Sequence, residues 1–279
     1  MQALKAKDNA KQKIRLDALL VERGLFDSRE QAKAVIMSGN VYIREHKADK
    51  PGMPVDINAD IDIRGKLPYV SRGGLKLEKA LKHFSVSPDG KICMDCGAST
   101  GGFTDCLLQN GAVMVYAIDV GYGQLAWAIR NDPRVITMER TNVRSLASDM
   151  FNPRPELAVI DLSFISLSLV FPVIAGIITE NGKILCLIKP QFEAGRDKVG
   201  KNGVVRDPKT HIDVLNAFMA HSQSAGLSVT GLTHSPVKGP KGNIEYLGRL
   251  NLSGRDTGNL TGSAVSVIDT VEQAHEELR

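Results

Sequence analysis

The sequence predicts an α/β protein, in which a Rossmann-like domain with a seven-stranded mixed sheet follows a small α+β domain. From Lys91 onward, short apolar runs alternate with stretches of helical periodicity, the pattern of a doubly wound sheet. A glycine-rich turn follows the first apolar run. Ahead of them lie two short helical stretches and a few short strand-like pieces around a Pro51-Gly52 turn. With 279 residues, 43% of them hydrophobic, the chain is long enough for one large domain and one small one.

Seven strands and four helices are expected in the larger domain. The predicted strands are Lys91–Met94, Val113–Ile118, Val135–Met138, Leu157–Ile160, Lys183–Ile188, Leu227–Leu232 and Ile244–Leu250. The predicted helices are Gly102–Gln109, Gln124–Arg130, Leu167–Ile178 and Pro208–Ala225. In such sheets, ligands bind at the carboxyl ends of the strands.

The expected domain organisation has five parts. A basic extension covers residues 1–13, and the small domain covers 14–64, with a helix from Ile14 to a stop at Gly24 and a second one that ends at Gly39. Residues 65–69 form a linker into the larger domain at 70–252. Residues 253–279 form a polar linker and an amphipathic helix.

Charge and cysteine content restrict the class of protein. The net charge of +4 permits a polyanionic partner without requiring one. The longest apolar region, Leu167 to Ile178, is too short to cross a bilayer, and the basic N-terminus does not resemble a signal peptide, so we expect a cytoplasmic protein without membrane contact. Cys93 and Cys96 form a C-x-x-C pair, but no second ligand pair follows, so we expect buried free thiols and no metal site.

The glycine-rich turn from Asp95 to Thr104 predicts a nucleotide cofactor. Its glycines allow a ligand to approach the backbone, and Asp119, at the end of the next strand, can accept hydrogen bonds from a ribose diol. A dinucleotide site requires a second glycine for the pyrophosphate, and that position is Ser99 here. The turn therefore favours S-adenosylmethionine, which keeps the ribose and has no pyrophosphate.

Two further strand ends carry charged residues. Asp161 ends the fourth predicted strand in Asp161-Leu162-Ser163-Phe164, without the double proline typical of amino-methylating enzymes. Lys189 ends the fifth, where a lysine is costly to bury unless it is paired or reactive. Glu245 lies in the last predicted strand, and Lys76 begins the helix ahead of the first. Any one of them alone would more often be a structural ion-pair partner.

The motifs together resemble one family. RLDALLVERG, SREQAKAVIMSGNVYI and KPGMPV resemble the S-four-type RNA-binding domain, while SRGGLKLEKAL, GASTGGFTD, DLSFISL, IKPQFEAGR and GNIEY resemble the FtsJ-like methyltransferase domain of the TlyA family. The resemblance covers residues 14 to 252 and implies S-adenosylmethionine-dependent 2′-O-methylation of a ribose, that of cytidine, in ribosomal RNA. It also implies that the partners are ribosomal RNA or assembled ribosomal subunits. We expect a monomer.

The resemblance and the strand ends assign site residues. The catalytic candidates are Lys76, Asp161, Lys189 and Glu245. The cofactor candidates are Asp95, Gly97, Ala98, Ser99, Gly101, Gly102, Phe103, Asp119, Val120, Asn142 and Asp161. The RNA-binding candidates are Lys13, Arg15, Arg29, Lys33, Arg72, Arg196 and Lys198.

The chemistry explains these residue types. A ribose hydroxyl is a poor nucleophile, and a nearby ammonium favours the alkoxide that develops on it; a lysine with a lowered pKa can also act as the base. We expect Lys189 to activate the hydroxyl, and Asp161 and Glu245 to orient the two amines. Two alternatives remain at this stage: an RNA-binding protein without catalysis, and the membrane-lytic activity implied by the label "haemolysin" often given to this family.

Overall fold

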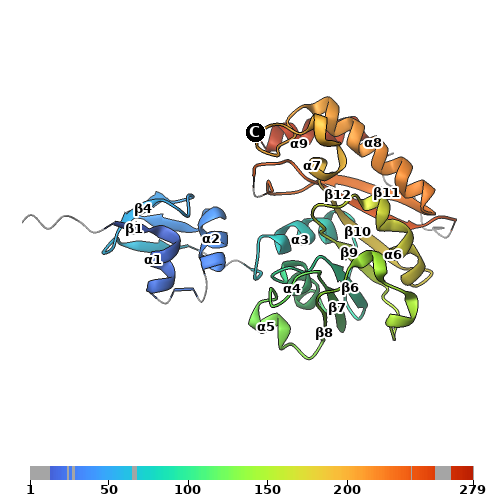
Figure 1. The fold of residues 1–279 in the computed structure, drawn as a ribbon, viewed down its shortest axis with the longest axis horizontal. Helices are drawn as coiled ribbons and strands as arrows, with labels where there is room; N and C mark the ends of the chain where they lie inside the picture. Colours follow the sequence, from blue (N-terminus) through green and yellow to red (C-terminus); the bar gives the residue numbers. More distant parts are fainter. Residues whose placement is uncertain are drawn as a thin grey trace, which may run out of the picture. The chain divides into compact units, whose positions relative to one another are not determined.

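The computed structural model describes residues 13–23, 25–26, 29–64, 68–239, 241–254 and 265–278. The chain divides into two compact units, Met1–Arg72 and Gly73–Arg279 (Figure 1). Residues 1–12 of the predicted basic extension (1–13), most of the 65–69 linker and most of the C-terminal linker lie outside the described residues.

The described residues of the first unit form two helices and five short strands. They are β1 (Lys13–Arg15), α1 (Leu16–Glu22), α2 (Arg29–Met37), β2 (Val41–Ile43), β3 (His46–Lys47), β4 (Pro54–Asp56) and β5 (Ile61–Ile63). β1 pairs with β4, and β2 lies between β3 and β5, all in antiparallel register. Leu16, Leu20, Val35 and Ile36 form its core between the two helices. The helix predicted from Ile14 is wrong in its first two residues, because Ile14 pairs with Val55 in a strand that the local periodicity did not reveal.

The second unit is the doubly wound domain that the sequence predicts. Its strands are β6 (Ile92–Cys96), β7 (Met114–Ile118), β8 (Val135–Met138), β9 (Leu157–Ile160), β10 (Lys183–Ile188), β11 (Leu227–His234) and β12 (Tyr246–Leu252). They form one sheet in the order β11-β12-β10-β9-β6-β7-β8. β12 lies antiparallel between β10 and β11, while β6 to β10 are parallel, so the mixed seven-stranded sheet is confirmed.

Helices cover both faces of the sheet. They are α3 (Gly73–His83), α4 (Gly102–Gln109), α5 (Trp127–Arg130), α6 (Phe171–Ile177), α7 (Pro190–Glu193), α8 (Pro208–Ser224) and α9 (Val267–Glu277), with short 3-10 turns between some of them. Phe171 of α6 and Phe218 of α8 pack with Ile118 and Ile160 in one core. α3 and α4 contact each other and contribute nothing to that core, so they cover the other face (Figure 1).

Two helix predictions need correction. The helix expected at Gln124–Arg130 is limited to Trp127–Arg130, because residues 119–126 form a loop in which Gly121 and Gly123 donate backbone hydrogen bonds to carboxylates. The helix expected at Leu167–Ile178 is split into a 3-10 turn (Leu167–Leu169) and α6, with Pro172 in the first turn of α6.

The four cysteines are free and buried, as the sequence predicts. Burial raises the pKa of Cys93 to about 12 and also raises the pKa of Cys96 and Cys186. Thiols buried in this way are inert packing groups. Over the residues that the structure covers, no group of three or more potential metal-ligating side chains was found.

Candidate active site

The glycine-rich turn approaches the end of β9 so closely that only glycine fits at its start. The turn follows β6, and the sheet reverses its order here, since β7 lies on one side of β6 and β9 on the other. Gly97 has a φ of +94°, and a Cβ atom there would clash with the carbonyl oxygen of Asp161. The switch point of the sheet, where such folds bind ligands, is therefore formed by the predicted cofactor turn and by Asp161.

Asp119, which follows β7, is held by two backbone amides. The N–H of Ser99 donates to one carboxylate oxygen at 2.8 Å, and the N–H of Gly121 donates to the other at 2.7 Å. A carboxylate oxygen can accept more than one hydrogen bond, so both remain able to accept from a diol. The side chain is thus oriented in advance for the role that the sequence predicts.

A cavity of about 640 Å³ opens beside these groups. Six of the predicted cofactor residues line it: Gly97, Ser99, Asp119, Val120, Asn142 and Asp161. The other five, Asp95, Ala98, Gly101, Gly102 and Phe103, do not line it and are buried. Gly101 and Gly102 lie where α4 begins, so their contribution is to the shape of the turn.

Asp95 is fully buried behind the turn. Thr104 donates a hydrogen bond to one of its carboxylate oxygens at 2.7 Å, and within the described ranges the other oxygen has no partner. Burial raises the pKa of this carboxyl to about 7. Its predicted direct contact with a cofactor stays a prediction.

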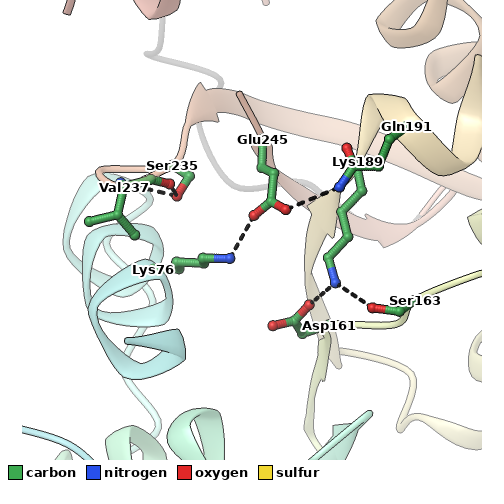
Figure 2. Close-up of polar contacts among 8 residues, drawn as sticks. All are labelled: Lys76, Asp161, Ser163, Lys189, Gln191, Ser235, Val237 and Glu245. Atoms are coloured by element: carbon green, nitrogen blue, oxygen red, sulfur yellow. Dashed lines mark hydrogen bonds and ion pairs between the residues drawn. The ribbon is translucent and has the colours of Figure 1, made fainter. Parts of the chain in front are cut away.

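The four catalytic candidates converge at the carboxyl edge of the sheet and form two ion pairs (Figure 2). Asp161 and Lys189 follow the parallel strands β9 and β10, so both lie at this edge. Glu245 directly precedes β12, whose antiparallel register pairs Tyr246 with Ile188 and brings Glu245 to the same edge. Lys76 comes from α3. The sequence placed Glu245 inside the strand predicted at Ile244–Leu250, whereas β12 begins at Tyr246, directly after Glu245.

The Lys189 ammonium is bound on one side of this cluster. It lies 2.6 Å from a carboxylate oxygen of Asp161 and donates to the hydroxyl of Ser163 at 3.0 Å. Only 11% of the Lys189 side chain is exposed. Because an ammonium has three N–H donors, one remains for a substrate oxygen.

The Lys76 ammonium is bound on the other side. It donates to Glu245 at 2.6 Å, and Gln191 donates to the second oxygen of that carboxylate at 3.3 Å. Glu245 is 1% exposed, so its charge requires this compensation. Two buried cations and two carboxylates leave the cluster neutral overall. Ser163 and Gln191 were missed from the sequence, although both lie within two residues of a predicted catalytic residue.

Two aromatic rings lie beside this cluster, and the sequence did not reveal their role. Phe164 follows Ser163 with a φ of +65° and is 90% exposed. Its ring lies 4.9 Å from that of Phe192, centre to centre. Phe164 also lines the cavity of the glycine turn, so it is exposed at the edge of the candidate site.

The RNA-binding candidates of the first unit are largely engaged in ion pairs. Arg15 and Arg29 both contact the buried carboxylate of Asp17, at 2.9 and 3.0 Å, and remain about half exposed. Lys33 lies 3.8 Å from Glu30, and Lys13 begins β1. The two arginines therefore have a structural role, and their remaining donors face solvent.

The other RNA-binding candidates come later in the chain, at the end of the first unit and in the second unit. Lys198 forms an ion pair with Asp213 at 2.8 Å, and Arg196 is exposed in the same 3-10 turn. Arg72 is half-buried at the boundary of the two units. Their role in RNA binding stays a prediction.

The ion pairs of Asp17 with Arg15 and Arg29 predict that the first unit loses stability in acid. The hydrogen bond from Arg15, aided by Arg29, lowers the pKa of Asp17 to about 2. Since the folded pKa lies below the unfolded value of about 3.9, this carboxylate stabilises the fold above pH 4, and the contribution is lost as the pH falls toward 2. We expect Asp17→Asn to flatten the pH dependence of unfolding of the first unit between pH 4 and 2, measured by circular dichroism of the full chain. An unchanged dependence would contradict the assignment, and Asp60→Asn is the matched control.

The fold and the two ion pairs beside a glycine-lined cavity define a methyltransferase of the Rossmann-like class, and the comparisons agree. The chain belongs to the FtsJ-like methyltransferase family, whose model matches residues 69–252, and an S4 domain matches residues 14–61. It is 51% identical to the "Putative rRNA methyltransferase YqxC" of Bacillus subtilis over 96% of each chain. It is 46% identical to the "16S/23S rRNA (cytidine-2'-O)-methyltransferase TlyA" of Mycobacterium tuberculosis, over 83% of this chain and 87% of that one.

A solved structure agrees as well. The "Putative hemolysin from Streptococcus thermophilus" superimposes with a TM-score of 0.74 at 46% identity, over 96% of this chain and 98% of that one. The resemblance to the TlyA family is therefore confirmed. Across the part of the chain that the structure describes, no helix is long and apolar enough to span a membrane.

Proposed function

We propose that this protein transfers the methyl group of S-adenosylmethionine to the 2′-hydroxyl of a cytidine ribose in ribosomal RNA. The observation that carries the proposal is the pair of Lys–carboxylate contacts, Lys189 with Asp161 and Lys76 with Glu245, of which Asp161 lines the cavity of the glycine turn. The names of the relatives support the substrate.

The cavity fits the proposed cofactor. Asp119 presents two oriented carboxylate oxygens for a ribose diol, and Asn142 and Val120 line the same wall. The absence of a side chain at Gly97 lets the backbone of Asp161 approach the turn, and both residues line the cavity. S-adenosylmethionine supplies an electrophilic methyl group when bound.

Activation of the hydroxyl falls to Lys189. Its remaining N–H can donate to the ribose oxygen, and the positive charge then lowers the pKa of that hydroxyl. Asp161 and Ser163 fix the direction of the ammonium, while Glu245 and Gln191 fix that of Lys76. Phe164 and Phe192 offer aromatic faces on which an unstacked base can lie.

Cofactor binding can be checked by itself. We expect Asp119→Asn to weaken S-adenosylmethionine binding by roughly 10- to 100-fold. The hydrogen bonds proposed from the ribose diol lose the charge of their acceptor, and the amide NH₂ of asparagine faces the backbone N–H of either Ser99 or Gly121. Isothermal titration calorimetry measures the dissociation constant. The exposed Asp149→Asn variant removes the same charge outside the cavity and should bind normally; equal affinity of both variants would show that Asp119 does not hold the ribose.

The decisive experiment is transfer of labelled methyl from S-adenosylmethionine to ribosomal subunits that lack the modification. We expect one labelled nucleotide, resistant to alkaline cleavage at its 3′ side because the 2′-oxygen is blocked. A labelled base or an unlabelled RNA would overturn the proposal. A non-catalytic RNA-binding protein would give binding without label.

A further inference from the structure

A second, basic cavity lies beside the C-terminal helix. It measures about 430 Å³ and is lined by three segments: the loop at 204–206, the turn from Lys238 to Ile244, and the end of α9 with His275 and Leu278. None of these residues belongs to the cofactor cavity.

Three cations line this cavity without a carboxylate partner. Arg206 and Lys241 are exposed and Lys238 is half-buried, and no ion pair joins any of them to an acidic group among the described residues. Elsewhere on the same unit, Arg134 and Lys198 are paired. The carboxylate beside the loop, Asp207, is occupied in capping α8, where it accepts from Lys209 and Thr210. Three cations beside this one carboxylate leave an excess of positive charge, which attracts an anion.

The segments that carry the cations are bonded to each other. In the turn, Gly239 donates to the carbonyl of Asn243 at 2.8 Å, and Gly242 donates to the carbonyl of Gly239 at 2.8 Å. The buried Asn243 side chain accepts from the N–H of Val205 at 3.0 Å and donates to the carbonyl of Gly203 at 2.9 Å. The backbone that carries the cations is thus ordered before a ligand arrives, which lowers the entropic cost of binding.

The same turn leads into the catalytic cluster. Ile244 lines the basic cavity, and the next residue, Glu245, holds Lys76. The backbone N–H of Ser235 donates to the backbone carbonyl of Glu245 at 2.8 Å, and a Cβ on Gly239 would meet the Glu245 carboxylate. The turn that carries Lys238 and Lys241 therefore packs against the carboxylate of Glu245 in the catalytic cluster.

We propose that this cavity binds a backbone phosphate of the RNA near the ribose that is methylated. Phosphodiester oxygens accept charge-assisted hydrogen bonds from lysine and arginine and release counterions on binding. Ile244 lines the cavity and the next residue, Glu245, belongs to the catalytic cluster, so a phosphate bound here would hold the RNA strand in register with the active site. Such a phosphate contact carries no sequence information. The proposal rests on the proposed function above.

The test measures binding to unmodified ribosomal subunits over a range of salt concentrations. We expect Lys238→Gln and Lys241→Gln to weaken binding roughly threefold each and about tenfold together, and to reduce the slope of log K against log salt by about 0.7 to 0.9 per contact. The affinity for S-adenosylmethionine and the melting temperature should not change. Lys82→Gln, an exposed charge on α3 outside the cavity, is the matched control.

Each result of these measurements either supports or refutes phosphate binding in the basic cavity. An unchanged affinity and slope, or an equal effect of Lys82→Gln, would overturn the subsite. A loss with assembled subunits that is absent with protein-free ribosomal RNA would assign the cavity to a ribosomal protein instead. If the double variant loses cofactor affinity or melts early, the exposed Arg206→Gln and Lys241→Gln variants decide. Absence of methyl transfer by the wild type refutes the proposed function, whereas normal transfer with unaltered salt dependence in the variants refutes the subsite alone.

Discussion

Replacing Lys189 with alanine is expected to lower the rate of methyl transfer by roughly 10²- to 10⁴-fold, the range for loss of a positioned acid–base group. The ammonium lies at the carboxyl edge of β10, between Asp161 and Ser163, with one donor left for the substrate. Single-turnover transfer to saturating ribosomal subunits measures the effect. The dissociation constant for S-adenosylmethionine, measured in parallel, separates loss of chemistry from damage to the cavity that Asp161 lines.

A second variant distinguishes the two ways in which Lys189 could act. Lys189→Arg keeps a cation beside Asp161, but a guanidinium does not lose its proton in proteins. If the residue acts as a base, arginine should be as inactive as alanine; if it acts only through its charge, part of the rate should return. Lys183→Ala, at the opposite end of β10, is the matched control. Full activity of Lys189→Ala would refute the role assigned to this lysine.

Replacing Gly97 with alanine is expected to abolish cofactor binding and to destabilise the second unit. The added Cβ would clash with the backbone of Asp161, and neither segment can move without disturbing the parallel pairing of β6 with β9. The positive φ of +94° adds strain of about 1–2 kcal/mol. We expect no measurable S-adenosylmethionine binding by calorimetry and a lower melting temperature.

Gly90→Ala separates the effect of the clash with Asp161 from the effect of the positive φ. Gly90 also has a positive φ, of +68°, but a Cβ there would meet nothing within 4 Å. This variant should lose only the conformational part of the stability and should bind the cofactor normally. Equal behaviour of the two variants would show that close approach at Gly97 is not what forms the cavity.

Strand positions were predictable because β6 to β10 are apolar runs bounded by polar turns. Lys183–Ile188 and Leu157–Ile160 agree in both bounds with β10 and β9. The failures lie where tertiary contacts override local periodicity. Ile14 joins a strand because Val55 lies opposite, and the residues before Trp127 lie in a loop whose backbone donates from Gly121 to Asp119, from Gly123 to Glu139 and from Ala126 to Thr100.

The candidate site was predictable to the extent that its residues follow strands. Asp161 and Lys189 are placed by the parallel pairing of β9 and β10, so their convergence follows from the fold class. The exposure of Phe164, the second contact of Lys189 with Ser163 and the capture of Arg15 and Arg29 by Asp17 have no periodic signal. Each depends on side-chain direction at a turn or a helix start.

The sequence by itself determined the fold class, the cofactor turn and the residue types of the catalytic cluster, because periodicity and glycine placement are local properties. Only the tertiary structure decided which lysine binds which carboxylate. Lys76 and Glu245 are 169 residues apart, and they meet because β12 runs antiparallel beside β10 and brings its first residues to the edge where the other strands end. The same reversal placed the turn with Lys238 and Lys241 beside the loop at 204–206 and formed the basic cavity.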